Sequence, residues 1–129
     1  MPALDTVKAH YDALARRDIE AALAVIDDAA VWEFCGPSTI PFAGQWRGRS
    51  GVRDFFDAIR STIEVKEFQV ERMVTDGDTV AVFGRERFLV KRTGKEWAVD
   101  WVQVHEVRNG RIVRFREYTN TAAIADAYT

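Results

Sequence analysis

The sequence predicts an α+β domain in which a cone-shaped, curved antiparallel β-sheet and three N-terminal helices enclose a mainly apolar pocket. Three observations support this fold class. Apolar residues in the first half of the chain recur at three- and four-residue spacing, which indicates helices. After Thr62, segments rich in Val, Phe and Trp alternate with Asp-Gly, Thr-Gly and Asn-Gly turn signals, which is typical of antiparallel strands. A length of 129 residues fits one domain, so we expect a single domain over residues 1–129.

Two helices are expected before residue 29. The apolar face of the first helix comprises Leu4, Val7, Tyr11 and Leu14. Asp18 is suited to cap the second helix, because a short polar side chain can accept a hydrogen bond from the first turn. The buried stripe of that second helix comprises Ile19, Ala22, Leu23 and Ile26, and Asp27-Asp28 is expected to end it.

A short strand from Ala29 to Phe34 is expected next, followed by a loop from Cys35 to Arg47 that glycine and proline punctuate. The loop contains three large apolar residues, Ile40, Phe42 and Trp46. We therefore expect it to pack against the domain. A third helix follows, with Ser50 as its cap and with Val52, Phe55, Phe56 and Ile59 at helical spacing.

The second half of the chain predicts a four-stranded antiparallel meander. Its strands are expected over residues 65–75, 79–91, 96–108 and 111–119. Long strands of this kind are expected to curl, because a flat sheet would leave its apolar face poorly covered. The Ala-rich tail over residues 120–128 is expected to form a short helical turn.

The strand over residues 96–108 predicts the position of the pocket. Strand side chains alternate between faces, so one face comprises Trp97, Val99, Trp101, Gln103, His105 and Val107. Apolar walls with a few hydrogen-bonding groups are typical of a ligand pocket. The opposite face presents Val102 and Val104 between acidic residues, and we expect it to form a homodimer interface.

Each polar candidate has a structural alternative. His105 could shuttle protons, but a hydrogen-bonded structural role is favoured for a lone histidine on an aromatic face. Gln103 is equally suited to bind a substrate oxygen or to satisfy a neighbouring strand. His10 borders the apolar stripe of the first helix, either inside the pocket or at its rim. Cys35 lacks a nearby activating base in the sequence, so a nucleophilic role is not expected.

Glu33 is the strongest candidate for a general base, because it lies between Trp32 and Phe34. A carboxylate that these aromatics desolvate would have a raised pKa. Strict alternation supports the opposite arrangement, in which Glu33 faces solvent while both aromatic side chains point inward.

Composition argues against several function classes. Lys plus Arg total 18 and Asp plus Glu total 20, which gives a net charge of −2 and no basic excess for nucleic acid. No apolar run approaches the ~20 residues of a membrane span, and the N-terminus does not resemble a signal peptide. A single cysteine is compatible with the reducing cytoplasm, which we take as the expected location. The two histidines are far apart in sequence and glycine-rich nucleotide loops are missing, so we expect no metal and no cofactor.

Several short motifs in order resemble SnoaL-like proteins of the ketosteroid isomerase and nuclear transport factor 2-like superfamily. They are His10–Asp18, Asp27–Glu33, Pro41–Gly48, Asp76–Val80, Arg108–Ile112 and Phe115–Asn120, and together they cover nearly the whole chain. The resemblance implies a base at Glu33, one hydrogen-bond donor at His10 or the adjacent Tyr11, and another at Gln103. Both donors differ from those of ketosteroid isomerase, so steroid isomerisation itself is not expected.

The implied substrate pocket comprises Trp32, Phe34, Phe42, Phe56, Trp101, His105 and Asn120. In the limonene epoxide hydrolase pattern of the same superfamily an Asp would stand at Asn120, and an asparagine cannot act as a base.

The resemblance therefore implies a cofactor-free isomerase, cyclase or hydratase that acts on a small apolar carbonyl compound. The alternative is a non-catalytic module that binds an apolar ligand or dimerises. Polar groups that converge inside the cavity would favour the enzyme, whereas a Glu33 side chain that points away from it would count against the enzyme.

Overall fold

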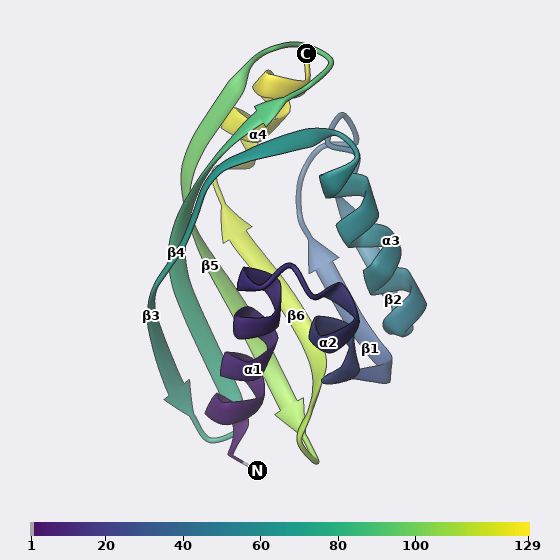
Figure 1. Ribbon diagram of the computed structural model, residues 1–129, viewed down its shortest axis with the longest axis vertical. Helices are drawn as coiled ribbons and strands as arrows, with labels where there is room; N and C mark the ends of the chain where they lie inside the picture. The colour runs from purple at the N-terminus through teal and green to yellow at the C-terminus, as the bar shows by residue number, and fades with distance from the viewer. Residues whose placement is uncertain (1) are drawn as a thin grey trace.

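The computed structural model describes residues 2–129, so the predicted domain is described except for its first residue (Figure 1). The helices are α1 (Ala3–Ala15), α2 (Ile19–Ala24), α3 (Gly48–Arg60) and α4 (Thr121–Tyr128). The strands are β1 (Ile26–Phe34), β2 (Gly44–Arg47), β3 (Ile63–Asp76), β4 (Thr79–Val90), β5 (Glu96–Arg108) and β6 (Arg111–Thr119). The α+β prediction is confirmed: six strands form one curved, open sheet in the order β2-β1-β6-β5-β4-β3.

The antiparallel meander is confirmed for β3 to β6, but the sheet as a whole is mixed. Strand β1 pairs in parallel with β6, with Trp32 opposite Phe115 and Phe34 opposite Glu117. Strand β2 then adds to β1 in antiparallel orientation. The prediction of a wholly antiparallel sheet is therefore wrong. The sequence does not indicate this pairing, because β1 and β6 are far apart in the chain and no turn signal joins them.

The predicted helices form, with corrected boundaries. Asp18 caps α2 by accepting a hydrogen bond from the Ala21 backbone N–H at 3.0 Å. Helix α2 ends at Ala24, and Ile26 belongs to β1, where it is buried. Helix α3 begins two residues before Ser50, since Gly48 already adopts its first helical position.

The loop after β1 packs against the domain as expected, and the tail is helical as expected. Ile40 and Phe42 in the loop after β1 are buried, although the end of that loop forms β2. The tail forms α4, whose Tyr128 ring lies 5.7 Å from the Trp97 ring and whose hydroxyl is 2.9 Å from Thr62 Oγ1. Figure 1 shows that α4 lies over the upper end of the sheet, while α1 and α2 cover its lower part and α3 lies beside β1 and β2.

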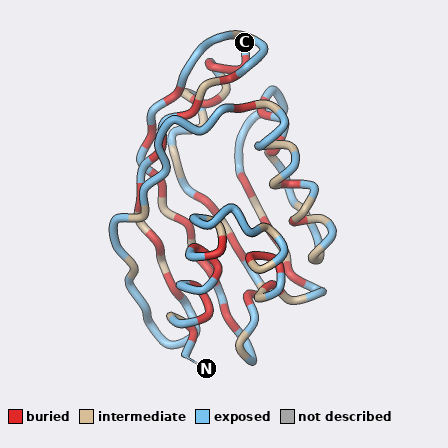
Figure 2. The backbone as a smooth tube through the Cα atoms, in the orientation of Figure 1, coloured by how far each residue is buried: buried red, intermediate tan, exposed pale blue. Residues whose placement is uncertain are grey.

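The alternation predicted for β5 is confirmed. All six residues of the predicted pocket face, from Trp97 to Val107, are buried, whereas Val102 and Val104 on the other face are half-buried. Figure 2 shows the buried residues on β1, β4, β5, β6 and the sheet-facing side of α1, with the edge strand β3 largely exposed. The core therefore lies between the concave face of the sheet and the helices. Within residues 2–129, no helix has the length and apolarity that crossing a bilayer requires.

A glycine determines how closely β4 and β5 pack. Gly84 pairs with Trp101 across the two strands. A Cβ at this position would collide with the Trp101 ring and with the Gln69 carbonyl oxygen. The absence of a side chain therefore lets the Trp101 indole approach the backbone of β4 closely.

Candidate functional site

A network of polar side chains lies in the apolar interior, between α1 and the concave face of β5 and β6. The Tyr11 hydroxyl donates to Gln103 Oε1, and Gln103 Nε2 donates to Glu117 Oε1 at 2.8 Å. His105 Nε2 lies 2.8 Å from the Tyr11 oxygen. We refer to Tyr11, Gln103, His105 and Glu117 as the interior network. All four residues are buried, and their hydrogen bonds replace those that water would supply.

The sheet register positions this network. Gln103 and Glu117 are direct partners across β5 and β6. Each stands two residues from the buried pair His105 and Phe115, so alternation places all four side chains on the concave face. Tyr11 reaches the pair from α1, where it follows Val7 by one helical turn and belongs to the same buried stripe. Three elements, α1, β5 and β6, thus bring a phenol, an amide and a carboxyl into one chain of hydrogen bonds.

A second buried carboxyl belongs to Glu86 on β4. Its Oε2 accepts a hydrogen bond from Trp97 Nε1 at 2.7 Å. Burial is the main cause that raises the pKa of Glu86, to about 7. The hydrogen bond from Trp97 lowers this pKa by a smaller amount. Burial also raises the pKa of Glu117 well above its usual range, and the negative charge of Glu86 raises it further. Such perturbed carboxyls concentrate at functional sites.

Both histidines are neutral near pH 7. Burial lowers the pKa of His10 to about 4, and burial together with the charge of His10 lowers the pKa of His105 well below its usual range. Because the Tyr11 hydroxyl donates to Gln103, the hydrogen-bonding pattern assigns the proton of His105 to Nε2, which then donates to the Tyr11 oxygen.

The structure separates His10 from Tyr11. His10 Nδ1 bonds the Ala22 carbonyl at 3.0 Å, so this side chain ties α1 to α2. Tyr11, not His10, contacts Gln103. Of the two donors that the sequence left open, Tyr11 is the one placed in the interior network.

Glu33 adopts the second of the two arrangements that the sequence left open, with its side chain on the outer face of the sheet. Glu33 is a direct neighbour of Arg116 across β1 and β6, with Oε1 at 3.4 Å from Arg116 Nε, and Gln45 Nε2 donates to its other oxygen at 3.4 Å. Trp32 and Phe34 point inward, so alternation along β1 turns Glu33 to the outer face.

The other predicted pocket residues divide into two groups. Core positions are taken by Trp32, Phe34, Phe42 and Trp101, which are buried, and by Phe56, which is half-buried. Asn120 is exposed and caps α4 by accepting from the Ala123 backbone N–H at 3.2 Å, so its expected place in the pocket is corrected. An apolar cavity among these aromatic side chains remains a prediction.

Sequence reasoning missed both interior carboxyls. On β4, Glu86 is separated by four residues from each of the buried Val82 and Val90. On β6, Glu117 follows the buried Phe115 by two residues. Period-two alternation therefore already placed both carboxyls on the buried face.

The residues of this interior differ slightly in how completely they are buried. Six concave-face or α1 residues keep 6–9% of their surface accessible while their neighbours are almost fully buried; they are Tyr11, Glu86, Phe88, Val99, Gln103 and Glu117. In addition, the indole nitrogens of Trp32 and Trp101 and Nδ1 of His105 are buried without a hydrogen-bond partner. Unpaired buried polar atoms beside a network of buried polar side chains are typical of a functional site.

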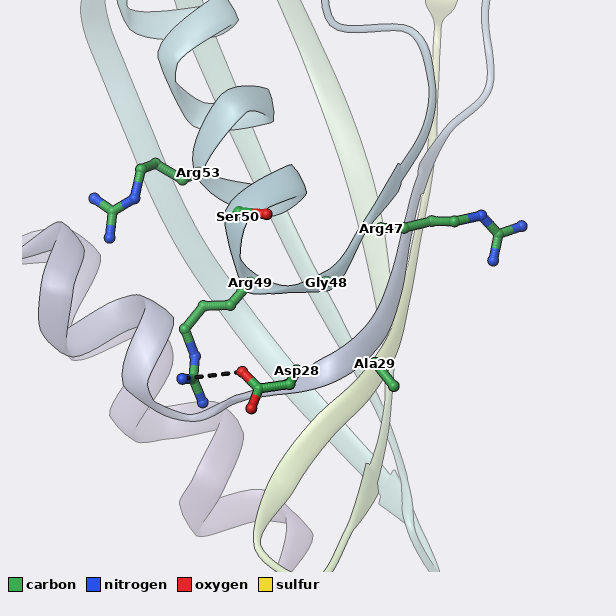
Figure 3. Close-up of a pocket in the computed structure, with 7 residues that line it drawn as sticks. All are labelled: Asp28, Ala29, Arg47, Gly48, Arg49, Ser50 and Arg53. Atoms are coloured by element: carbon green, nitrogen blue, oxygen red, sulfur yellow. Dashed lines mark ion pairs between the residues drawn. The ribbon is translucent and has the colours of Figure 1, made fainter.

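The surface hollow beside the start of α3 differs from the interior in its chemistry. It measures about 660 Å³, and its lining residues are Asp28, Ala29, Arg47, Gly48, Arg49, Ser50 and Arg53 (Figure 3). Arg49 pairs with Asp28 at 3.1 Å and donates to the Ile26 carbonyl, while Arg53 pairs with Glu20. Figure 3 shows that the arginine side chains diverge. These cations therefore connect structural elements rather than converge on a ligand.

Among residues 2–129, no three His, Cys, Asp or Glu side chains form a group that could hold a metal ion. The chemistry available in the interior is that of carboxyls, a phenol, an amide and neutral imidazoles.

Comparison with known proteins agrees with this architecture. A nuclear transport factor 2-like protein of Burkholderia thailandensis superposes with a TM-score of 0.91 at 30% identity, covering 100% of this chain and 98% of the other. A Bacillus subtilis protein provisionally named an isomerase gives a TM-score of 0.79 at 25% identity, covering 98% and 91%. The uncharacterized Bacillus subtilis protein YesE is 23% identical over 134 residues, which cover 98% of this chain and 86% of YesE. The SnoaL-like domain matches residues 7–115, and the chain therefore belongs to the SnoaL-like family, with the fold of nuclear transport factor 2-like proteins.

Proposed function

We propose that this protein is a cofactor-free acid–base enzyme of the isomerase, cyclase or hydratase type that acts on a small apolar carbonyl compound, with Glu117 as its proton carrier. The supporting observation is the buried interior network, in which Glu117 is linked through Gln103 to Tyr11. A general base works best when its pKa lies near the operating pH, and the raised pKa of Glu117 moves this carboxyl in that direction.

In the proposed reaction, ionised Glu117 removes a proton from the carbon next to the substrate carbonyl. The Tyr11 hydroxyl turns from Gln103 to the substrate oxygen and stabilises the developing enolate by hydrogen bonding. Gln103 keeps the Glu117 carboxylate oriented. Protonated Glu117 then returns the proton to the same molecule at another carbon, which completes an isomerisation without a cofactor.

Two criteria from the sequence bear on this proposal in opposite directions. Glu33 points away from the interior, which counts against the enzyme in the form that uses Glu33 as base. Convergence of Tyr11, Gln103 and Glu117 supports an enzyme that uses a different base. The structural relative named provisionally as an isomerase supports the same reaction class.

Proton exchange tests the proposal on a panel of candidate substrates. Small apolar ketones and enones are incubated with the protein in D₂O, and loss of the α-proton signals is followed by ¹H NMR. Glu117→Gln is expected to slow enzyme-dependent exchange about 10²–10⁴-fold, the usual contribution of a general base. The matched control Glu33→Gln should retain wild-type exchange, because Glu33 lies on the outer face.

Unchanged exchange in Glu117→Gln would overturn the assignment of the base. A panel without any exchange in the wild-type protein would favour the alternative, a non-catalytic module that binds an apolar ligand.

We also propose that the outer face of the sheet forms a homodimer interface. Phe83, Val102 and Tyr118 are aligned across β4, β5 and β6, and the Tyr118 side chain is half exposed. A row of apolar side chains on an open sheet face is suited to pairing with a second copy. Analytical ultracentrifugation should find a dimer for the wild-type protein and a monomer for Val102→Glu, while the control Glu106→Gln stays dimeric. A monomeric wild-type protein would refute the interface.

A further inference from the structure

Helix α4 covers the end of the concave face that holds Trp97 and Glu86 (Figure 1). Its buried side, formed by Ile124, Ala127 and Tyr128, faces the sheet. Trp97 of β5 lies between the helix and the carboxyl. The Trp97 ring centroid is 5.7 Å from that of Tyr128, and Trp97 Nε1 donates to Glu86 Oε2 at 2.7 Å. A movement of α4 would therefore uncover this indole and the carboxyl that it binds.

Three hydrogen bonds hold the C-terminal turn of α4 to neighbouring segments. Thr93 Oγ1 donates to the Ala127 carbonyl at 2.6 Å, and Arg92 donates to the Tyr128 carbonyl. The Tyr128 hydroxyl lies 2.9 Å from Thr62 Oγ1. At its other end, one exposed residue joins α4 to β6. A helix of eight residues is not stable by itself, so loss of these contacts would unfold α4 locally while the sheet persists.

Glu86 is the group beside α4 that titrates near neutral pH, because burial raises its pKa to about 7. Its neighbours on the sheet are the Trp97 N–H from β5, the apolar Phe68 from β3 and the carboxyl of Glu117 from β6. Burial and the charge of Glu86 raise the pKa of Glu117 well above its usual range, which favours a single negative charge at Glu86. Tyr11 from α1 is neutral, because burial and the charge of Glu117 raise the pKa of its hydroxyl.

The helix itself contributes one neutral group to this environment. Burial raises the pKa of the Tyr128 hydroxyl, the hydrogen bond with Thr62 lowers it, and the charge of Glu86 raises it further. Asp126, the acidic residue of α4, is exposed, and the exposed Arg92 binds the Tyr128 carbonyl. The ionised form of Glu86 therefore lacks a cationic partner beneath α4 and gains most from contact with water.

Hydration of Glu86 in an open form links the position of α4 to pH. In the closed form the carboxyl retains its proton up to about pH 7, whereas a hydrated carboxyl releases it near pH 4.5. Between these values rising pH favours the open form, by about tenfold per pH unit when the carboxyl is fully hydrated. Below about pH 4.5 both forms are protonated, and above about pH 7 both are ionised, so the open fraction becomes constant in each range.

We propose that α4 is a pH-dependent lid on the upper end of the interior: it opens by local unfolding from Asn120 onward, and ionisation of Glu86 favours the open form. Opening uncovers Trp97 and Glu86 and admits water to this end of the concave face. The inference goes beyond the proposed function, since it holds whether or not Glu117 is the base of a reaction.

Hydrogen exchange of single backbone amides, followed by NMR between about pH 5.5 and 8, tests the lid. Each rate is divided by that of an unstructured amide at the same pH, so the quotient reports opening alone. For residues 125–128 we expect this quotient to rise about 10–30-fold from about pH 5.5 to 8, as linkage to Glu86 requires. Amides of β5 should exchange more slowly at every pH, because they exchange only when the sheet opens.

Two glutamate variants separate the charge of Glu86 from other effects of pH. Glu86→Gln keeps an oxygen for the Trp97 N–H, and its quotient for α4 should change less than about 3-fold over the same range. Slow exchange of the β5 amides verifies that this variant is folded. The control Glu96→Gln removes an exposed glutamate that pairs with Arg87, and it should retain the wild-type pH dependence.

A thiol on the buried side of α4 gives a second measurement of opening. Ala127 is buried, so Ala127→Cys places a thiol there, and Cys35→Ser removes the exposed native thiol. A dipyridyl disulfide labels the introduced thiol, and its rate is divided by that of an unstructured cysteine peptide at the same pH. This quotient should also rise about 10–30-fold between about pH 5.5 and 8, and Glu86→Gln should abolish the rise.

An α4 quotient that does not change with pH would overturn the inference. So would the same pH dependence in Glu86→Gln, or α4 amides that exchange no faster than those of β5. Each outcome is distinguishable from failure of the proposed function. A pH-dependent lid together with unchanged proton exchange of substrates in Glu117→Gln would refute the enzyme alone. Lost substrate exchange in that variant together with a pH-independent α4 would refute the lid alone.

Discussion

Glu86→Gln is expected to stabilise the folded protein above about pH 7, although the substitution lies in the core. The pKa of Glu86 rises from the ordinary 4.5 to about 7 because the carboxyl is buried. Each unit corresponds to about 1.4 kcal/mol, so ionised Glu86 destabilises the folded state by about 3 kcal/mol. Glutamine carries no such charge and retains an acceptor for the Trp97 N–H.

The pH dependence follows from the direction of this shift. Below about pH 4.5 Glu86 is protonated in both the folded and the unfolded chain, and the variant and the wild type should be equally stable. Between about pH 4.5 and 7 the unfolded chain releases the proton while the folded chain retains it, so the wild type loses stability. Above about pH 7 the full difference of about 3 kcal/mol in favour of the variant should be present.

Urea denaturation followed by circular dichroism at several pH values between about 4.5 and 8 measures this difference. Ionisable groups that do not interact with Glu86 cancel when the two unfolding free energies are subtracted. Glu117 does not cancel, because the charge of Glu86 raises its pKa, and its contribution adds to the difference in the same direction. The control Glu96→Gln, an exposed glutamate, should show little pH-dependent difference from the wild type. A variant that is less stable than the wild type at pH 8, or a difference that does not change with pH, would refute the reasoning.

Two further substitutions probe the interior. Gly84→Ala places a methyl group against the Trp101 ring and should lower the unfolding free energy by about 1–3 kcal/mol, the usual cost of overpacking; a loss below about 0.5 kcal/mol in urea denaturation would contradict this packing. Tyr11→Phe leaves Gln103 Oε1 and His105 Nε2 without their buried partner and should cost about 1–3 kcal/mol, and a loss below about 0.5 kcal/mol in the same assay would contradict the interior network.

Local patterns predicted much of the fold because the relevant interactions are local. The cap at Asp18, the meander and the alternation along β5 each depend on residues a few positions apart or joined by a tight turn. The parallel pairing of β1 with β6 depends on where two distant segments meet, and neither segment contains a signal for the other. Ile26 fits the helical spacing of the second helix, but a buried isoleucine suits a helix or a strand equally well. Its spacing alone therefore does not predict that it belongs to β1.

The proposed base was the least predictable part of the candidate site, and the reason lies in β1 and β6. Glu33 and Glu117 both lie within two residues of large aromatic residues in strands, so the local composition does not distinguish them. The sheet face on which each side chain lies does distinguish them. Glu33 alternates with buried Trp32 and Phe34 and pairs with Arg116 on the outer face. Glu117 lies on the same face as buried Phe115 and accepts a hydrogen bond from Gln103. Glu33, which has the Arg116 cation beside it, remains near the surface. Glu117 has only the Gln103 amide as its partner, and burial raises its pKa. In this chain, whether a strand glutamate faces the interior is therefore better predicted from its alternation with the buried aromatic residues of the same strand than from the nearest matching motif.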